Sequence, residues 1–263
     1  MKNIISEVSS IQKEIKEIRT RIFAEIITEG VDDPGILKCI FLAGGPGSGK
    51  SYVAKEIFGV GKGDLQSVSA GGLKIINSDT AFEQALKKNG INPGDLADIA
   101  KNDPNFWAFI AGETGDSIRN KSKEITRKQQ AFYEAGRLGM IIDGTGDEVM
   151  KIRKKLFHAK SLGYDCYMVF VNTSLEVAQK RNKERSRKLD PKLVDDIWRK
   201  CQENLGHFQG MFGNNFIIVD NTEYQPVNKS IQKQVDSFLR KPIENPLGKK
   251  WILGARLLKK HLK

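Results

Sequence analysis

The sequence predicts an α/β fold, a three-layer sandwich in which helices cover both faces of a five-stranded parallel sheet. Five short apolar runs recur along the chain, stretches with helical periodicity separate them, and a glycine-rich loop follows the first run. Strands that are apolar along their whole length are typical of parallel sheets buried on both faces. The length of 263 residues suits one large domain with additions at its ends.

The strands are expected, in order, at residues 37–44, 73–77, 139–143, 164–172 and 215–221. Longer helices are expected at 50–58, 147–162, 174–185, 192–209 and 227–240. We therefore divide the chain into an amphipathic N-terminal helix, a core, and a C-terminal helix with a basic tail, at 1–30, 36–222 and 223–263. The core contains a helical insertion and an arginine-rich lid, at 80–138 and 180–192. Breaks in the insertion are expected near Gly90–Pro93 and Asp103–Pro104.

The N-terminal helix is predicted from apolar residues in a heptad pattern. The seam consists of Ile4, Val8, Ile11, Ile15, Ile18 and Ile22. A helix docked on its own core and a helix that self-associates both give this pattern. Self-association through residues 4–22 therefore stays open.

The formal net charge of +11 is concentrated in two segments. Residues 240–263 carry +7 and residues 180–200 carry +5, whereas residues 1–30 are neutral and the rest sums to −1. Localised charge indicates localised anionic partners. For the tail, a nucleic-acid backbone, an anionic membrane and the protein's own core all remain open as partners.

The composition excludes several classes of protein. No apolar run approaches the roughly 18 residues that a transmembrane helix needs, and the charged N-terminus does not resemble a signal peptide. The cysteines, Cys39, Cys166 and Cys201, are far apart, and the three histidines are scattered, so no zinc cluster is visible. We expect a reduced, cytoplasmic protein.

The strongest motif is a phosphate-binding loop. Its residues are Gly44, Gly45, Pro46, Gly47, Ser48, Gly49, Lys50 and Ser51, which match G-x-x-x-x-G-K-[ST] at every fixed position. The glycines let backbone N–H groups turn toward phosphates, and the helix that follows points its positive end at the same anion. We expect Lys50 to reach the β- and γ-phosphates of ATP and the Ser51 hydroxyl to ligate Mg²⁺.

Two carboxylates stand at strand ends. Asp79 follows the second strand and Asp143 ends the third, so both should face the crevice that holds the loop. We expect Asp79 to accept the proton of an acceptor hydroxyl, although its surroundings also suit a helix N-cap. Asp143 is expected to help position Mg²⁺ through water, or to contact the substrate.

Arginines in the basic segment are candidates for charge stabilisation. Arg181, Arg185 and Arg187 lie at a predicted helix end and in the loop after it, where a mobile lid would close over the transferred phosphate and exclude water. A solvated helix face is the alternative. Three more arginines, Arg119, Arg127 and Arg137, lie in the insertion that is expected to build the acceptor pocket. Scattered surface positions suit them as well.

Taken together, these segments resemble the P-loop kinase superfamily over residues 37–221. The resemblance rests on GGPGSGKS, IINSDTAF, IIDGT, VNTSLEVAQKRNKER and FIIVDN. Within the superfamily the chain is most similar to zeta-toxin-like and polynucleotide-kinase-like proteins, in versions often carried by bacteriophages. The resemblance implies ATP, Mg²⁺, Asp79 as the base and the 181–187 arginines as the lid. A phage-encoded protein would work in the host cytoplasm.

The function expected is therefore an ATP-dependent kinase that transfers the γ-phosphate to a hydroxyl of a nucleic acid or nucleotide. A nucleotide-sugar kinase acting on UDP-N-acetylglucosamine is the alternative within the class. A nucleotide-dependent assembly or scaffold ATPase is the alternative from another class. No DxDxT motif follows the core, which disfavours an enzyme that also removes phosphates.

Overall fold

The computed structural model describes residues 13, 14, 16, 17, 30–33, 35–59, 69, 72–185, 188–223 and 225–261. Its centre is a five-stranded, all-parallel sheet with the order β2-β3-β1-β4-β5. The strands are β1 (Lys38–Ala43), β2 (Lys74–Ile76), β3 (Met140–Asp143), β4 (Asp165–Asn172) and β5 (Phe216–Asp220). Each strand lies within its expected range, which confirms the α/β fold.

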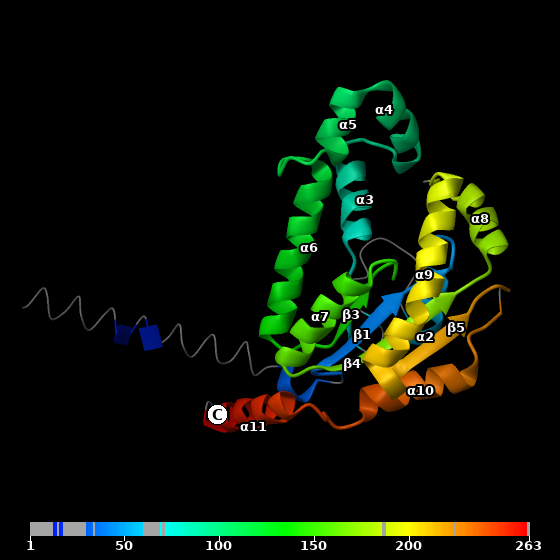
Figure 1. Cartoon of the computed structure of the whole chain (residues 1–263). Coiled ribbons are helices and arrows are strands. Elements are labelled where there is room, and N and C mark those ends of the chain that lie inside the picture. The colour runs from blue at the N-terminus through cyan, green and yellow to red at the C-terminus, as the bar shows by residue number, and fades with distance from the viewer. Residues whose placement is uncertain are drawn as a thin grey trace, which may run out of the picture.

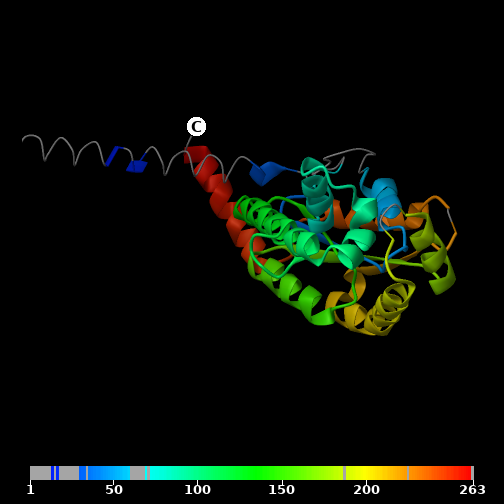
Figure 2. The same cartoon turned by 90° about the horizontal axis from the view of Figure 1, so that it is seen from above.

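Helices cover both faces of this sheet (Figure 2). Alternate side chains of β1 point to opposite faces: Cys39 and Phe41 join one core cluster, and Ile40 and Leu42 join the other. The first cluster packs under α7 (Val149–Ser161) and α9 (Pro191–Phe212), and the second under α2 (Lys50–Phe58) and α10 (Lys229–Arg240). The central strands are therefore buried on both faces, as their apolar runs predicted, whereas Ile218 of the edge strand β5 remains exposed.

The helical insertion rises from the carboxyl edge of the sheet as an arm (Figure 1). It consists of α3 (Ser78–Lys88), the short η2 (Pro93–Asp95), α4 (Leu96–Asn102), α5 (Pro104–Ala111) and α6 (Ile118–Ala135). Its own buried cluster includes Phe82, Leu86 and Ile110. The helices break at the expected places, and the Asp103 carboxylate caps α5 by accepting from the backbone N–H of Phe106. The arm thus has its own apolar support and faces α9 across the carboxyl edge.

The C-terminal segment docks on the core. After α10, residues 241–245 lead into α11 (Pro246–His261), which buries Ala255 and packs Trp251 against the core cluster below the sheet. The link is tied down by Asp165, whose carboxylate accepts from the Lys38 ammonium at 3.1 Å and from two backbone N–H groups of the link at 2.9 Å. Of the partners considered for the tail, the structure shows the protein's own core.

The six residues of the predicted heptad seam, between positions 4 and 22, lie outside the described residues, as does Arg187. Among the residues that the structure does describe, no helix is long and apolar enough to cross a bilayer. All three cysteines are free and buried.

Candidate active site

The phosphate loop connects β1 to α2, and its shape depends on glycine. Gly47 and Gly49 have φ angles of 74° and 83°, in the left-handed region that L side chains rarely adopt. A Cβ at Gly47 would lie 2.4 Å from the Ala178 carbonyl oxygen, and one at Gly49 would lie 2.1 Å from the Asn221 side chain. The backbone is therefore both turned and tightly enclosed, and no other residue type fits these two positions.

Two side chains from distant parts of the chain brace the loop. The buried Asn221, just after β5, donates a hydrogen bond from its amide to the Ser48 carbonyl at 2.7 Å. The Arg181 guanidinium donates to the Gly47 carbonyl at 3.3 Å and to the Thr222 carbonyl at 3.4 Å. Because these bonds occupy the carbonyl groups on the outside of the loop, the loop is held in shape before any nucleotide binds.

Lys50 and Ser51 open α2 directly behind the loop. The Lys50 ammonium donates to the Gly44 carbonyl at 2.6 Å, so it lies folded across the concave side where a phosphate would bind. The Ser51 side chain is exposed in the first turn of the helix. The positive end of the helix, the ammonium and the hydroxyl therefore converge on one anion-binding position.

A cavity of about 230 Å³ lies at the carboxyl edge of the sheet next to the loop. Lys50, Asp79 and Asp143 all line it. Asn77 joins the two acidic residues: its amide donates to the Asp143 carboxylate at 2.6 Å, and its carbonyl oxygen caps α3 by accepting from the Asp79 and Thr80 backbone N–H groups. The N-cap is therefore Asn77. The cap role considered for Asp79 is wrong, because Asp79 lies in the first turn of α3 and lines the cavity.

Asp143 is the buried carboxylate of the site. Burial raises its pKa, and the Lys50 ammonium acts in the opposite direction. Its Oδ1 atom is buried and has no hydrogen-bond partner in the part of the chain that the structure describes. Such an oxygen suits a water molecule bound to Mg²⁺. Ser51 and Asp143 thus fit the expected ion. The described residues contain no cage of three or more acidic, histidine or cysteine ligands, so ATP phosphates and water would complete the shell.

Arg119 enters the site from α6. Its guanidinium lies 2.9 Å from the Asp79 carboxylate and stacks over the Phe82 ring, with 4.8 Å to the ring centroid. Its side chain is 27% exposed and that of Asp79 is 56% exposed, so the pair lies at the cavity wall and remains open to a ligand. The other two arginines of the insertion line neither this cavity nor the adjoining cavity of about 420 Å³ on the arm side. Arg127 is exposed, and Arg137 stacks on Trp251 of the docked tail.

The two described arginines of the predicted lid, Arg181 and Arg185, differ in their surroundings, and the lid role stays a prediction. Arg181 is 8% exposed and contacts the back of the phosphate loop, because α8 (Leu175–Glu184) packs Ala178 against Gly47 one turn earlier. Arg185 is exposed and lines neither cavity. The loop after α8 is closed at its base, where Asn182 and Leu189 exchange two hydrogen bonds of 2.8 and 3.0 Å.

Helix α9 holds the other wall of the cavity. The Asn204 amide donates to the carbonyl groups of Gly146 and Asp147, at 3.0 Å each, and the Cys201 thiol donates to the Thr145 carbonyl at 3.2 Å. Burial raises the pKa of Cys201 to about 12, so the thiol stays protonated and serves as a donor. These bonds hold the loop after β3 against α9, and the Gly44 backbone N–H, which donates to the Thr145 carbonyl at 3.0 Å, links that loop to the phosphate loop.

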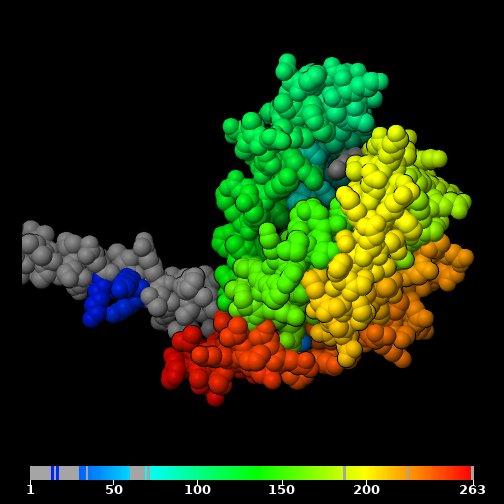
Figure 3. Space-filling view, viewed as in Figure 1, coloured from blue at the N-terminus to red at the C-terminus, as the bar shows by residue number. Residues whose placement is uncertain are grey.

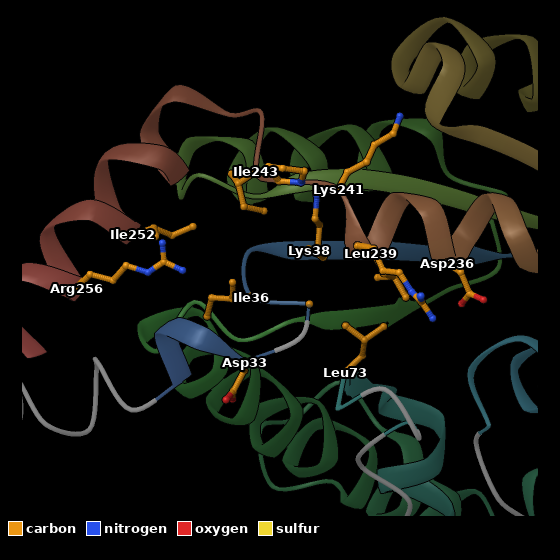
Figure 4. Close-up of a pocket in the computed structure, with 13 residues that line it drawn as sticks. Asp33, Ile36, Lys38, Leu73, Asp236, Leu239, Lys241, Ile243, Ile252 and Arg256 are labelled. Carbon is orange, nitrogen blue, oxygen red and sulfur yellow. The ribbon is translucent and has the colours of Figure 1, made fainter.

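A larger cavity, of about 580 Å³, lies at the opposite edge of the sheet (Figure 4). It is bounded by β1, the end of α10 and the inner face of α11. Two of its cations are already paired within the protein: Lys38 with Asp165, and Arg256 with Asp32. The larger cavity lies far from the phosphate loop, whereas Lys50 of that loop lines the smaller one. We therefore place the active site in the smaller cavity.

The fold and this site define an enzyme of the P-loop phosphotransferase type. The model of a family described as AAA domain matches residues 39–206, and the chain belongs to this family. The match covers more than half of the chain and includes the phosphate loop, the insertion and α8.

Several solved structures are similar to the chain. A chain of the PezAT chromosomal toxin–antitoxin system of Streptococcus pneumoniae is 16% identical, with a TM-score of 0.48, over 88% of this chain and 87% of that one. AvrRxo1-ORF1:-ORF2 with ATP is 12% identical, with a TM-score of 0.43, over 88% and 72%. Shikimate kinase from Acinetobacter baumannii, in complex with shikimate, is 12% identical, with a TM-score of 0.38, over 81% and 96%. A search of curated proteins finds no match.

Sequence reasoning missed Asn77, Asn204 and Asn221, and it offered Arg119 only as one of three arginines scattered through the insertion. Asn77 and Asn221 directly follow strands. Residues at the carboxyl ends of parallel strands face the ligand crevice, and this rule, which selected Asp143, would have found both. Arg119 and Asn204 carry no such signal, because they reach the site only through the packing of α6 and α9.

Proposed function

We propose that the protein is an ATP-dependent kinase of the reducing cytoplasm, which transfers the γ-phosphate of ATP to a hydroxyl of a nucleic acid or nucleotide. One observation carries the proposal: Lys50, Asp79 and Asp143 line a single cavity beside the phosphate loop. A carboxylate beside the phosphate loop suits a transfer in which the acceptor hydroxyl must give up its proton.

The residues suit an in-line transfer. The loop N–H groups and Lys50 would hold the β- and γ-phosphates, and Lys50 would stabilise charge on the departing ADP oxygen. Mg²⁺, held by Ser51 and water-linked to Asp143, would neutralise phosphate charge. The acceptor oxygen forms its bond to the γ-phosphorus as the bond to the ADP oxygen breaks, and its proton passes to the Asp79 carboxylate.

The support for Asp79 as the base is its geometry. It lies one turn into the arm that rises beside the cavity, and Arg119 holds its carboxylate from the side at 2.9 Å. Arg181 supports the loop from behind by hydrogen bonds, and so contributes to transfer by positioning the loop.

The test is incubation of the full chain with γ-labelled ATP, Mg²⁺ and a panel of acceptors. The panel contains oligonucleotides with 5′-hydroxyl ends, nucleosides, nucleotides and UDP-N-acetylglucosamine, and products are read by mass. Transfer to a nucleic acid or nucleotide supports the proposal, with Lys50→Ala as the inactive control. Transfer to UDP-N-acetylglucosamine alone would select the nucleotide-sugar kinase. ATP hydrolysis that no acceptor stimulates, accompanied by rings or filaments, would select the assembly ATPase.

A further inference from the structure

A second cavity, of about 420 Å³, adjoins the first on the arm side. It lies between the arm and the segment that leads into α9, and a hollow is visible between these parts in the space-filling view (Figure 3). Its volume is within the range of roughly 300–1,000 Å³ that is usual for small-molecule sites. The lining residues that matter for recognition are Phe82, Trp107, Arg119, Lys123, Lys188 and Leu189.

The charge of this cavity has one sign. Arg119, Lys123 and Lys188 line it, and among the residues that the structure describes no aspartate or glutamate does. Phe82 and Trp107 supply aromatic surface in the same cavity. Cations beside aromatic rings suit a ligand that combines an anionic group with a flat ring.

Arg119 connects this cavity to the cavity beside the phosphate loop, because it lines both. Phe82, under its guanidinium, lies on α3 one turn after Asp79. A ligand that fills the second cavity therefore lies beside the carboxylate that faces the phosphate loop. Its anionic group can share the Arg119 guanidinium, which has five N–H donors and lies 2.9 Å from the Asp79 carboxylate.

We propose that this cavity is the acceptor site and that the acceptor is a small, phosphate-bearing molecule with a flat ring, of mononucleotide size. The inference rests on the proposed kinase function and narrows its substrate class. A nucleic-acid strand binds along a row of phosphates in an extended basic groove. Here three cations surround one hollow of limited volume. Arg119 and Lys123 recognise the phosphate of the acceptor, Trp107 contacts its ring, and Phe82 supports Arg119 from below.

The experiment separates binding from transfer. The ATP site of the full chain is first saturated with a non-hydrolysable ATP analogue and Mg²⁺. The four mononucleotides UMP, CMP, AMP and GMP are then titrated by calorimetry, each beside its uncharged nucleoside. We expect at least one mononucleotide to bind about tenfold or more tightly than its nucleoside, as a charge-assisted contact predicts. Arg119→Ala and Lys123→Ala should remove most of this preference, while Arg119→Lys keeps part of it.

Arg127→Ala is the matched control, since it removes one exposed charge from the same helix and lines neither cavity. A purely structural role of Arg119 would weaken mononucleotide and nucleoside equally and leave their ratio unchanged. The proposal is overturned by that result, by no mononucleotide binding, or by a short oligonucleotide that binds more tightly than every mononucleotide. If mononucleotides bind as expected but no acceptor in the panel is phosphorylated, the kinase proposal fails while the anion site stands.

Discussion

The Arg119 guanidinium lies 2.9 Å from the Asp79 carboxylate, although the two residues belong to different helices of the arm. Asp79 stands at the start of α3, where the chain leaves β2, and Arg119 stands at the start of α6, where the chain returns. The arm therefore delivers two functional groups to one wall of the site. This pair lies where the cavity beside the phosphate loop meets the proposed acceptor cavity. The proposed phosphoryl transfer therefore depends on it.

Lys50→Ala should lower phosphoryl transfer by about 100-fold or more and weaken ATP binding, because the ammonium is the charge that the loop presents to the β- and γ-phosphates. Binding of a fluorescent ATP analogue and transfer rates would measure this. Lys55→Ala is the control, since Lys55 is exposed on the same helix. Equal effects of the two variants would contradict the assignment.

Asp79→Asn should slow transfer by about 10²–10⁴-fold while leaving ATP binding unchanged, because an amide cannot take the proton of the acceptor hydroxyl. Folding should be preserved, since Asn77 and not Asp79 caps α3. Asp116→Asn, at an exposed carboxylate of the same insertion, is the control. A normal transfer rate in Asp79→Asn would show that Asp79 is not the base of the reaction.

Arg181→Ala should weaken ATP binding by about tenfold and lower the melting temperature by a few degrees, because it removes the donor to the Gly47 carbonyl and a brace between the loop and Thr222. The control is Arg185→Ala, at the exposed end of the same helix. The mobile-lid interpretation makes the opposite prediction: slower transfer with unchanged ATP affinity and unchanged thermal stability. The two measurements together decide between these roles.

Asp143→Asn should raise the melting temperature at neutral pH. Burial raises the pKa of Asp143 above its ordinary value of 3.8, so ionising it costs folding free energy. That cost is absent below pH 3.8 and is fully present once the pH exceeds the raised pKa. The increase in melting temperature of Asp143→Asn over wild type should therefore become smaller as the pH falls. Each kcal/mol relieved corresponds to about 2–4 °C in a chain of this size.

Thermal melts of Asp143→Asn and wild type from acid to neutral pH would show whether the two melting temperatures approach each other as the pH falls. Asp98→Asn, at an exposed carboxylate of α4, should show no such pH-dependent gain. A stability difference for Asp143→Asn that stays constant with pH, or that has the opposite sign, would contradict the role of burial.

The sequence predicted the strands and most helices because their signals are local. Apolar runs, glycine loops and helix caps depend on neighbours within a few residues, and the phosphate loop is complete within eight. The burial of Arg181 was not predicted for the same reason: a run of arginines shows charge but not burial. Only the packing of Ala178 against Gly47 turned Arg181 toward the loop backbone.

By itself, the sequence determined that this protein folds as a parallel α/β sandwich with a phosphate loop, because those features follow from local pattern and from the strand-end rule. The tertiary structure decided what surrounds the phosphates. It brought Asn221 and Arg181 behind the loop, Asn77 between the two aspartates, and Arg119 against Asp79. These contacts join residues far apart in the chain, and their partners are fixed only when the helices pack.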